Sequence, residues 1–359
     1  MHLTRHLIGA SAACVAVAFC SASLRADYVL GGGASGTYRI ANDGTFVVGY
    51  FPPPDVESEI EALGIDHVVM PDFTTLYQFT NTLGFSHLTL AFETATGAYL
   101  ADQTLHSGPC CFPPPNEDFI ANARMPLIRA TDPLGAGDLF VISGNFGYPD
   151  GSMPQIKRYN RATDSYVESI NPPTSQGIYD IAFGPDNRLF MAAEHGIFIY
   201  EETTAGFELL SASPLLGSVT GTMAFLADGL LLVRDLASGN VNRYTAQGQF
   251  VDTLIPAATI PENLVSYGSS FIRPGRGGIH FGADGNVHLP IDSRLPGDDY
   301  LPVHYIGRYD GTTGALLSMI KIDFGAFGRV TYLPVPEPTS QLLVAIGLAL
   351  FLSRRHWIA

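Results

Sequence analysis

One short pattern occurs six times along the chain: a strand that begins with an aromatic residue, a polar turn that usually contains Thr or Gly, and a second strand. The six copies begin at Tyr38, Phe92, Tyr159, Tyr200, Tyr244 and Tyr309. Asp-Gly or Thr-Gly between alternating apolar residues predicts a β-hairpin. Because the copies follow one another at spacings of 54, 67, 41, 44 and 65 residues, they indicate an internal repeat.

A second pattern precedes three of the hairpins. Phe183, Phe225 and Phe281 each begin a five-residue turn with Asp at its fourth position, and an apolar strand follows, for example residues 230–233. Two strands around one tight turn and two more around the next make a four-stranded antiparallel sheet. Such a sheet is one blade of a β-propeller, so we expect an all-β fold.

The two ends of the repeat region complement each other. Residues 324–330 copy the spacing of residues 281–287, yet no aromatic hairpin follows them, whereas residues 28–50 supply the second half of a unit without its first half. Joining the halves would close the ring through a strand at 330–333 and remove its exposed sheet edges. We therefore predict a six-bladed propeller over residues 27–333, with one blade shared by both termini.

The unit at residues 233–244 resembles the NHL repeat, in which a Val-x-Asp turn leads into a strand that ends near Arg-Tyr. Residues 156–160 and 306–310 match its second half, and the units around Asp186, Asp228 and Asp284 match most closely. Residues 52–72 and 103–125 depart from the pattern. We expect these proline-rich segments to be insertions on one face of the disc, where loops carry function.

The C-terminal segment, residues 334–359, contains Val335, Pro336, Glu337 and Pro338, then an apolar run over 342–352, then Arg354 and Arg355. This order closely resembles the PEP-CTERM sorting signal of Gram-negative bacteria, which the membrane protease exosortase reads. Residues 341–352 would form a short helix of about 18 Å, less than the roughly 30 Å of a hydrocarbon core. The two arginines should stay cytoplasmic, which places the body outside the inner membrane.

Residues 1–26 have the form of a secretory signal peptide, with Arg5 and His6 before an apolar core at 7–19, which should be helical. Cleavage after Ala22 or after Ala26 fits the small residues there. The Sec translocon and signal peptidase are the partners that this leader implies. Phe19 disfavours lipidation of Cys20, because a small residue is normally needed before a lipidated cysteine.

Only Cys110 and Cys111 remain once the leader, with Cys14 and Cys20, is removed. They lie in a proline-rich loop, and neighbouring cysteines have poor geometry for an ordinary disulfide. We favour a vicinal disulfide that stiffens the loop, since no His or Cys spacing nearby indicates a redox or metal role.

The body is strongly acidic. Removing Arg5, Arg25, Arg354 and Arg355 leaves 15 of the 19 basic residues against 34 acidic ones, a net charge of −19. Such a surface should repel nucleic acid and anionic lipid. It suits a soluble exported protein, and it could also gather divalent cations.

The glycines at 31, 33 and 36 satisfy the spacing of a dinucleotide-binding loop. That fingerprint requires a helix after the loop, whose N-terminus holds the phosphate. A strand and an Asp-Gly turn follow instead, so we reject a nucleotide site. The chain also lacks a Gly-x-Ser-x-Gly elbow, a His-Glu-x-x-His helix and a Walker loop.

Two sets of residues remain as candidates for chemistry. Oxygen ligands at comparable turns of several blades would suit calcium, as in gluconolactonase-type lactonases, which are similar six-bladed rings. The alternative, which we favour, is that each side chain caps its own turn. A histidine near the central funnel could act as a general base, as in the similar streptogramin lyases. The metal candidates are Asn145, Glu194, Asp235 and Asp292; the catalytic candidates are His195, His280 and His288, with His67 in the first unit.

Two hypotheses about function follow. The first is a non-catalytic propeller, exported across the inner membrane, held transiently by its tail and then placed at the cell surface or in the extracellular matrix. There it would bind glycan, such as exopolysaccharide, or protein. The second is a calcium-dependent lactonase or lyase with its site in the central funnel. Because no catalytic motif is present, we favour the first.

Overall fold

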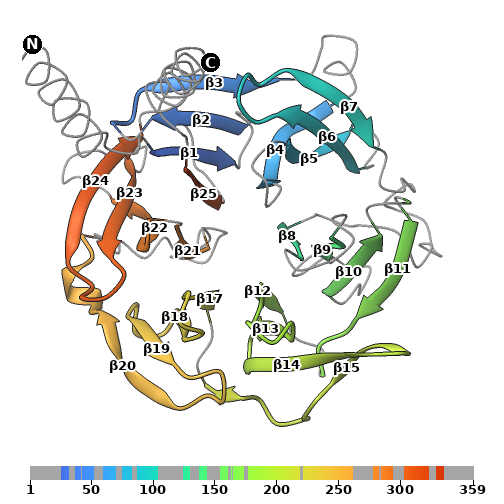
Figure 1. The fold of residues 1–359 in the computed structure, drawn as a ribbon, viewed down its shortest axis with the longest axis vertical. Coiled ribbons are helices and arrows are strands. Elements are labelled where there is room, and N and C mark those ends of the chain that lie inside the picture. The colour runs from blue at the N-terminus through green and yellow to red at the C-terminus, as the bar shows by residue number, and fades with distance from the viewer. Residues whose placement is uncertain are drawn as a thin grey trace, which may run out of the picture.

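In the computed structural model the chain folds into six antiparallel β-sheets around a central axis (Figure 1). The structure describes residues 26–31, 37–41, 43–51, 60–69, 75–82, 87–103, 124–129, 137–143, 154–160, 163, 165–173, 177–218, 221–261, 278–282, 284–293, 303–322 and 329–334. The predicted six-bladed propeller is confirmed.

Both ends of the repeat region build one sheet, the closing blade. Its order from the axis outward is β25 (Arg329–Pro334), β1 (Ala26–Gly31), β2 (Thr37–Ala41) and β3 (Phe46–Tyr50). Ala26 lies opposite Pro334 in the antiparallel pair β1–β25. The closure by both termini is therefore confirmed, although the N-terminal part supplies three strands and not half a blade, because β1 already is the second strand.

The other five blades are continuous in sequence, and we number them in chain order. The first blade consists of β4 (Ile60–Val69), β5 (Thr75–Thr82), β6 (His87–Glu93) and β7 (Tyr99–Gln103). The second consists of β8 (Arg124–Ile128), β9 (Leu139–Ser143), β10 (Gln155–Asn160) and β11 (Ser165–Ile170).

The third blade consists of β12 (Ile178–Phe183), β13 (Leu189–Ala193), β14 (Gly196–Thr203) and β15 (Gly206–Leu209), and the short β16 (Leu216–Gly217) also pairs with β14. The fourth contains β17 (Gly221–Phe225), β18 (Leu231–Asp235), β19 (Val241–Tyr244) and β20 (Phe250–Ile255), followed by the 3₁₀ turn η1 (Ala257–Thr259). The fifth contains β21 (His280–Phe281), β22 (Asn286–Ser293), β23 (Val303–Asp310) and β24 (Leu316–Ile322).

Both repeated patterns are where the sequence predicts them. Each of the six aromatic hairpins joins the third strand of a blade to its fourth, and each of the three Phe-to-Asp turns joins the first strand to the second. Asn187, Gly229 and Gly285 occupy the same place in those three turns and have φ values of 63°, 84° and 75°. Glycine and asparagine are the residues that tolerate this left-handed conformation.

One expectation about insertions is wrong. Residues 60–69 fall in the segment that we expected to lie outside the repeat, but they form β4, the innermost strand of the first blade. The sequence gives no Phe-to-Asp turn after β4, so the signal that marks the innermost strands β12, β17 and β21 is missing. Most of the second segment, 103–125, lies outside the described residues.

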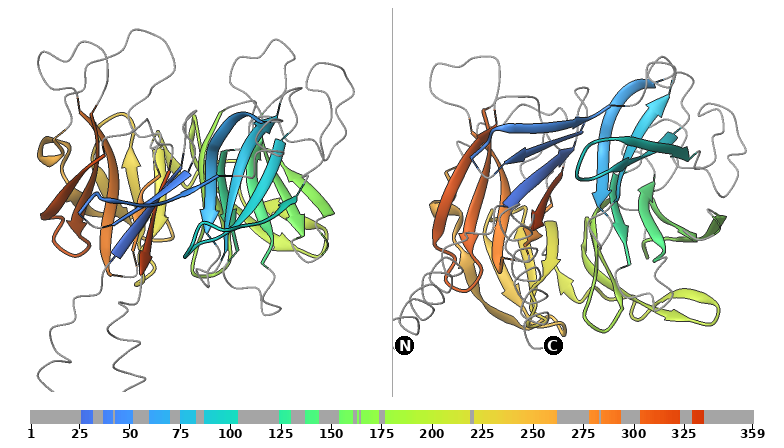
Figure 2. Two further views of the ribbon diagram at one scale, coloured as in Figure 1. Left: turned by 90° about the horizontal axis from the view of Figure 1, so that it is seen from above. Right: turned by 45° about the horizontal axis from the view of Figure 1, so that its top comes forward.

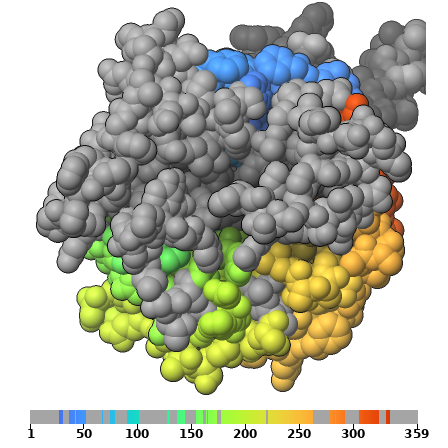
Figure 3. Space-filling model, turned by 180° about the vertical axis from the view of Figure 1, so that it is seen from behind, coloured from blue at the N-terminus to red at the C-terminus, as the bar shows by residue number. Residues whose placement is uncertain are grey.

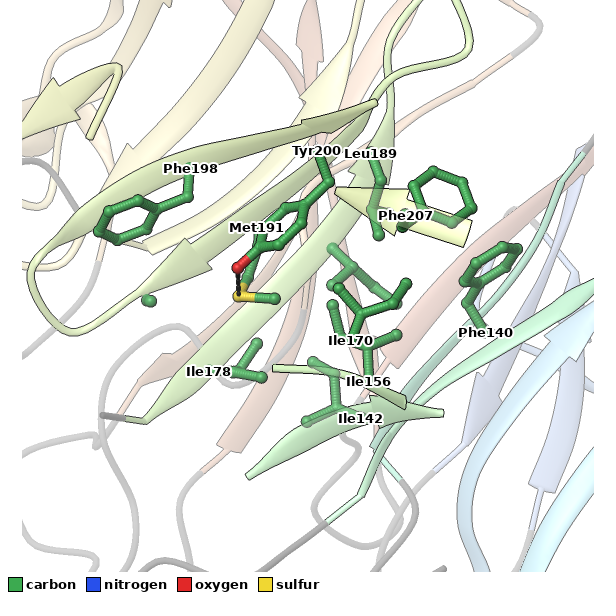
Figure 4. Packing of buried hydrophobic residues seen from close by; sticks show 12 residues of the cluster. Phe140, Ile142, Ile156, Ile170, Ile178, Leu189, Met191, Phe198, Tyr200 and Phe207 are labelled. Carbon is green, nitrogen blue, oxygen red and sulfur yellow. Dashed lines mark hydrogen bonds between the residues drawn. The ribbon is translucent and has the colours of Figure 1, made fainter. Parts of the chain in front are cut away.

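The hydrophobic core lies between neighbouring blades, not within one layer. The first residue of most aromatic hairpins is buried there: Phe92, Tyr159, Tyr200, Tyr244 and Tyr309. The closing blade differs, because Ile40 takes this position and the aromatic ring comes from Tyr28, directly across the strand pair. Figure 4 shows the packing between the second and third blades, where Phe140, Met191 and Phe207 belong to one buried cluster.

The strand directions divide the disc into two faces. The turns between first and second strands and between third and fourth strands share one face, which we call the turn face; the other is the loop face. Asp27 pairs with Ala41, at the end of β2 where the turn to β3 begins, and its neighbour Ala26 pairs with Pro334. The repeat region therefore begins and ends at the turn face (Figure 2). Figure 3 shows the loop face, where surface of the third and fourth blades is visible.

The outer edge of the disc has a repeated irregularity. In five blades the pairing between the third and fourth strands shifts by one residue just after the turn, which leaves one residue of the fourth strand without an opposite partner. These shifts are β-bulges. The third blade differs, because β14 and β15 pair without a shift.

No helix among the described residues is long and apolar enough to cross a membrane. Apart from Ala26 and Pro334, the predicted leader and sorting tail lie outside the described residues, and so do the two helices that we expect there. The motif residues Val335, Pro336, Glu337, Pro338, Arg354 and Arg355 are all in that part, as are Cys110 and Cys111. These expectations remain predictions.

Candidate functional site

The most chemically elaborate cluster of the described residues forms around Asp284, in the turn between β21 and β22. Its Oδ1 accepts a hydrogen bond from the backbone N–H of Asn286 at 3.2 Å. The equivalent carboxylates do the same: Asp228 accepts from Leu230 N at 3.1 Å and Asp186 from Arg188 N at 3.3 Å. The repeat therefore places a carboxylate here first of all to cap a tight turn.

Asp284 has three further side-chain partners, whereas Asp186 pairs with one, Arg188 Nε at 3.4 Å. Asn286 Nδ2 donates to Oδ2 at 2.7 Å, and Arg308 on β23 donates to the same oxygen from Nε at 3.0 Å. The Arg308 guanidinium forms an ion pair with this carboxylate, with Nη2 2.9 Å from Oδ2. His288 Nε2 on β22 lies 3.1 Å from Oδ1. The carboxylate thus binds one backbone and three side-chain groups, and the side chains come from two neighbouring strands.

His288 connects this cluster to the closing blade. Its ring is stacked on Tyr332 of β25, with centroids 4.6 Å apart and planes at 27°, and it meets Tyr28 of β1 edge-on at 5.3 Å. The His288 side chain has no exposed surface. Because Tyr28 and Tyr332 lie opposite each other near the two ends of the repeat region, the cluster fastens both ends to the fifth blade.

Gly282 makes this close approach possible. A Cβ atom at this position would lie 2.4 Å from Asp284 Oδ1, 2.7 Å from His288 Nε2 and 3.0 Å from the Tyr332 ring. Since such distances are too short for non-bonded carbon, a side chain at position 282 would push the carboxylate and the imidazole apart.

The protonation states follow from burial and hydrogen bonding. Burial would raise the pKa of Asp284, but the hydrogen bonds from His288 and Asn286 outweigh it and hold the pKa well below its usual value. Burial lowers the pKa of His288, against the opposing effect of Asp284. A neutral His288 beside an ionised carboxylate must donate from Nε2, so Nδ1 is the unprotonated nitrogen.

The cluster is built to hold position, not to transfer protons. Nδ1 of His288 has no hydrogen-bond partner among the described residues and is shut off from solvent. A general base must reach the proton that it removes, directly or through one water. Burial also raises the pKa values of Tyr28 and Tyr332, which keeps both phenols neutral. The arrangement therefore resembles a clamp at the joint where the ring closes.

Arg308 belongs to a repeated set that the sequence interpretation missed. Arg39, Arg158, Arg243 and Arg308 occupy the same position, one residue before the buried core residue of the third strand. Each pairs with a carboxylate: Arg39 with Asp27, Arg158 with Asp138, and Arg243 with Asp252. The signal was visible as the Arg-Tyr pairs at 158–159, 243–244 and 308–309, which we had used only to recognise the repeat.

The structure brings two of the three catalytic candidates together. His280 on β21 pairs with His288 on β22, and their ring centroids lie 6.2 Å apart. His195 lies in the exposed turn between β13 and β14, on the loop face and far from this pair in the fold. His67 on β4 is buried, with Nε2 3.0 Å from Thr331 Oγ1 of β25, so it connects the first blade to the closing blade.

The metal candidates do not form a cluster among the described residues. Asp235 caps its own turn, accepting from Ser238 N at 3.0 Å, Ser238 Oγ at 2.6 Å and Ala237 N at 3.3 Å. Glu194 is exposed in the turn after β13. Asp292 lies on β22 and its side chain is not described, while Asn145 lies outside the described residues.

Strand register separates these candidates by position. Leu189, Leu231 and Val287 are equivalent, since each lies opposite the core tyrosine of its third strand. Glu194 is five residues after Leu189 and Asp292 is five residues after Val287, but Asp235 is four residues after Leu231. Asp235 is therefore offset by one residue from the position that Glu194 and Asp292 share. Within the described part of the chain no three His, Cys, Asp or Glu residues are grouped to hold a metal, and calcium stays a prediction.

Comparisons with known proteins agree on the fold. No protein-family model matches the chain, and no curated protein matches it by sequence. A protein of unknown function from Bacteroides caccae is 13% identical with a TM-score of 0.54, and the match covers 87% of this chain and all of that one. The periplasmic gluconolactonase PpgL of Pseudomonas aeruginosa is also 13% identical, with the same coverage and a TM-score of 0.50.

TolB from Acinetobacter baumannii is a third similar structure, with 12% identity, a TM-score of 0.53, and coverage of 87% of this chain and 67% of that one. These three proteins share an overall shape with this chain at identities too low to transfer an activity. The likeness establishes the propeller fold, and the function has to be argued from the site itself.

Proposed function

We propose that this chain is an exported, non-catalytic propeller that its C-terminal segment holds transiently at the inner membrane. It then reaches the cell surface or the extracellular matrix and binds glycan or protein on its loop face. The observation that carries the proposal is the pairing of Ala26 with Pro334, which puts both ends of the repeat region on the turn face. A leader and a sorting tail attached there would hold the turn face toward the membrane. The loop face would then point outward.

Several candidate residues already have hydrogen-bond partners within the protein, which supports a binding role for the protein over a catalytic one. The Asp284 carboxylate is occupied by Asn286, His288 and Arg308, and Asp235 by its own turn. His288 is enclosed by Tyr28 and Tyr332. Residues that look catalytic in the sequence therefore have a structural use. The exposed pair Glu194 and His195 lies on the loop face, where a ligand would meet it.

A matched pair of charge reversals tests which face binds. Exopolysaccharide purified from the native host, immobilised on a sensor, is the probe. Glu194→Lys on the loop face should change the affinity by about threefold or more, as a contact charge does, whereas Glu208→Lys on the outer strand β15 should leave it unchanged. Equal effects of the two reversals would refute loop-face binding.

The lactonase hypothesis makes a different prediction, and calorimetry separates the two. Glu194, Asp235 and Asp292 belong to consecutive blades and lie near the same face, which is the feature that favours this alternative. A lactonase of this kind should bind calcium at millimolar levels or below, and Asp235→Ala should abolish both the binding and lactone hydrolysis. We expect no calcium binding that depends on Asp235, since its carboxylate already serves its turn.

The sorting proposal has its own test. Intact-mass analysis of the protein from its native host should show loss of the residues near Pro338. A full-length C-terminus in a host with active exosortase would contradict it. This result is independent of what the loop face binds.

A further inference from the structure

In each of the five outer strands that have the bulge after the turn, the bulged residue is apolar. The five bulges leave Val47, Leu100, Val167, Val251 and Leu317 without an opposite residue on the third strand. All five side chains are exposed, between 43% and 55%. A bulge protects a sheet edge by bending it, and this protection does not require an apolar residue; proteins more often place a charge there.

Neighbouring residues enlarge this apolar surface. Phe46, Phe250 and Leu316 directly precede three of the bulges and are exposed by 56%, 59% and 45%. Every large hydrophobic side chain that is exposed among the described residues lies on a fourth strand or directly after one. The apolar surface of this protein is therefore concentrated on its outer rim.

The third blade lacks the feature. Its strands β14 and β15 pair without a bulge, Phe207 is buried, and Glu201 and Glu208 are exposed opposite each other near the turn. Near its turn the rim of this blade is acidic, and its exposed apolar residue, Leu210, comes only after β15 has ended. The difference cannot come from the fold, because all six blades have the same strand order.

The blade without the bulge lies opposite the closing blade. The five blades with an apolar bulge are consecutive, the closing blade is the middle one, and the acidic third blade lies across the ring from it (Figure 1). The bulges follow directly after the turns of the turn face, where Ala26 and Pro334 lie. The apolar rim is thus centred on the blade from which both chain ends leave.

We propose that this apolar rim, defined by the five bulged residues, rests on a lipid surface with neutral headgroups. The proposal builds on the proposed function, in which the tail holds the turn face toward a membrane. The turns 42–45, 94–98, 245–249 and 311–315 beside four of the bulges contain a single charged residue, Asp43, and the turn 161–164 beside the fifth contains one charge of each sign, Arg161 and Asp164. Turns with so little net charge fit a neutral surface. The apolar run at 342–352 spans only about 16 Å as a helix, too little to cover a rim that extends over five blades.

Tryptophan fluorescence can test the rim and the tail separately, because Trp357 is the only tryptophan of the chain. In the full chain with Trp357→Phe, the additional change Leu100→Trp or Leu317→Trp places a probe on either side of the closing blade. Leu210→Trp, 46% exposed after the outer strand of the third blade, is the matched control. The probe surface is a vesicle of phosphatidylcholine with brominated acyl chains, which quench only tryptophan that reaches the lipid.

We expect the emission at positions 100 and 317 to fall about twofold or more and the emission at 210 to stay constant, since only the first two would reach the acyl region. If neither rim probe is quenched while Trp357 of the unaltered chain is, the tail holds the protein and the rim inference fails alone. If Trp357 is not quenched either, the anchoring proposal fails as well. Emission at 100 and 317 that is already blue-shifted without vesicles would overturn the inference, because the rim would then be covered by protein.

Discussion

Two turns of this molecule have nearly the same sequence and very different surroundings. Residues 227–229 and 283–285 both read Ala-Asp-Gly, beginning two residues after the phenylalanine that starts the same pattern. Within the described part of the chain, Asp228 accepts one hydrogen bond, from Leu230 N. Asp284 caps its turn in the same way and also binds Asn286, His288 and Arg308.

The difference separates the contacts common to every repeat from those found only where the fifth blade meets the closing blade. Leu232 occupies the position in the fourth blade that His288 has in the fifth, and Leu232 belongs to a hydrophobic cluster. The fifth blade borders the closing blade, whose two inner strands come from opposite ends of the repeat region. A joint without chain continuity is held here by a buried carboxylate, an imidazole and two tyrosines.

The largest effect should come from removing the Asp284 carboxylate. Asp284→Ala leaves Arg308 and His288 without their shared acceptor, and breaking such a buried pair should lower the free energy of unfolding by about 3 kcal/mol. Equilibrium urea unfolding measures the loss. Asp228→Ala is the matched control, and equal losses in the two variants would mean that Asp284 is only a turn cap.

Lowering the pH should reduce the stability of the protein through the same cluster. The folded-state pKa of His288 lies below its unfolded value, so below about pH 6.5 the unfolded chain binds more protons and stability falls, by at most about 1.4 kcal/mol per pH unit. The low pKa of Asp284 adds a further loss only below its unfolded value of 3.8. Urea midpoints between pH 7.5 and 5.5 should show a slope that His288→Leu reduces; an unchanged slope would assign the titration to another group.

His288→Leu should itself be mildly destabilising. The change introduces leucine, the residue that the fourth blade has at the equivalent position. It removes the ring stack on Tyr332 and one hydrogen-bond donor to Asp284. A loss of about 1 kcal/mol is expected, because an aromatic pair contributes roughly that amount beyond its buried area. Thermal unfolding at pH 7.5 gives the value. A more stable variant would show that the imidazole is kept for a purpose other than packing.

Asp228→Ala should have the smallest effect. It removes one hydrogen bond from an exposed turn, so the free energy of unfolding should fall by about 0.5 to 1 kcal/mol. The matching change Asp186→Ala should give a similar value, since Asp186 caps the equivalent turn. A loss above about 2 kcal/mol at either position would contradict the view that these two carboxylates serve only their own turns.

The parts of this fold that could be predicted from the sequence are those set by local contacts. Each hairpin is encoded within about ten residues by an aromatic residue, a turn with glycine or threonine, and alternating apolar positions. Strand β4 escaped notice because no such turn follows it. The closing strand was found only because residues 324–330 repeat a spacing used earlier in the chain.

The candidate site was harder to predict because its partners are far apart in the chain. Asp284 and His288 are four residues apart, but Tyr28 comes from the other end of the repeat region and meets them only when the ring closes. The calcium set illustrates the same difficulty. The Val-x-Asp match grouped Asp235 with Glu194 and Asp292, and the pairing of strands shows that it is offset from them by one residue.

Native-state hydrogen exchange tests most directly whether the Asp284 cluster fastens the joint. In Asp284→Ala the amides of β1 and β25 should exchange about tenfold faster relative to those of β18 and β19, because the closing blade would open before the rest of the disc. In Asp228→Ala this ratio should stay at its original value. An unchanged ratio in Asp284→Ala would contradict the account, since the cluster would then not hold the two ends together.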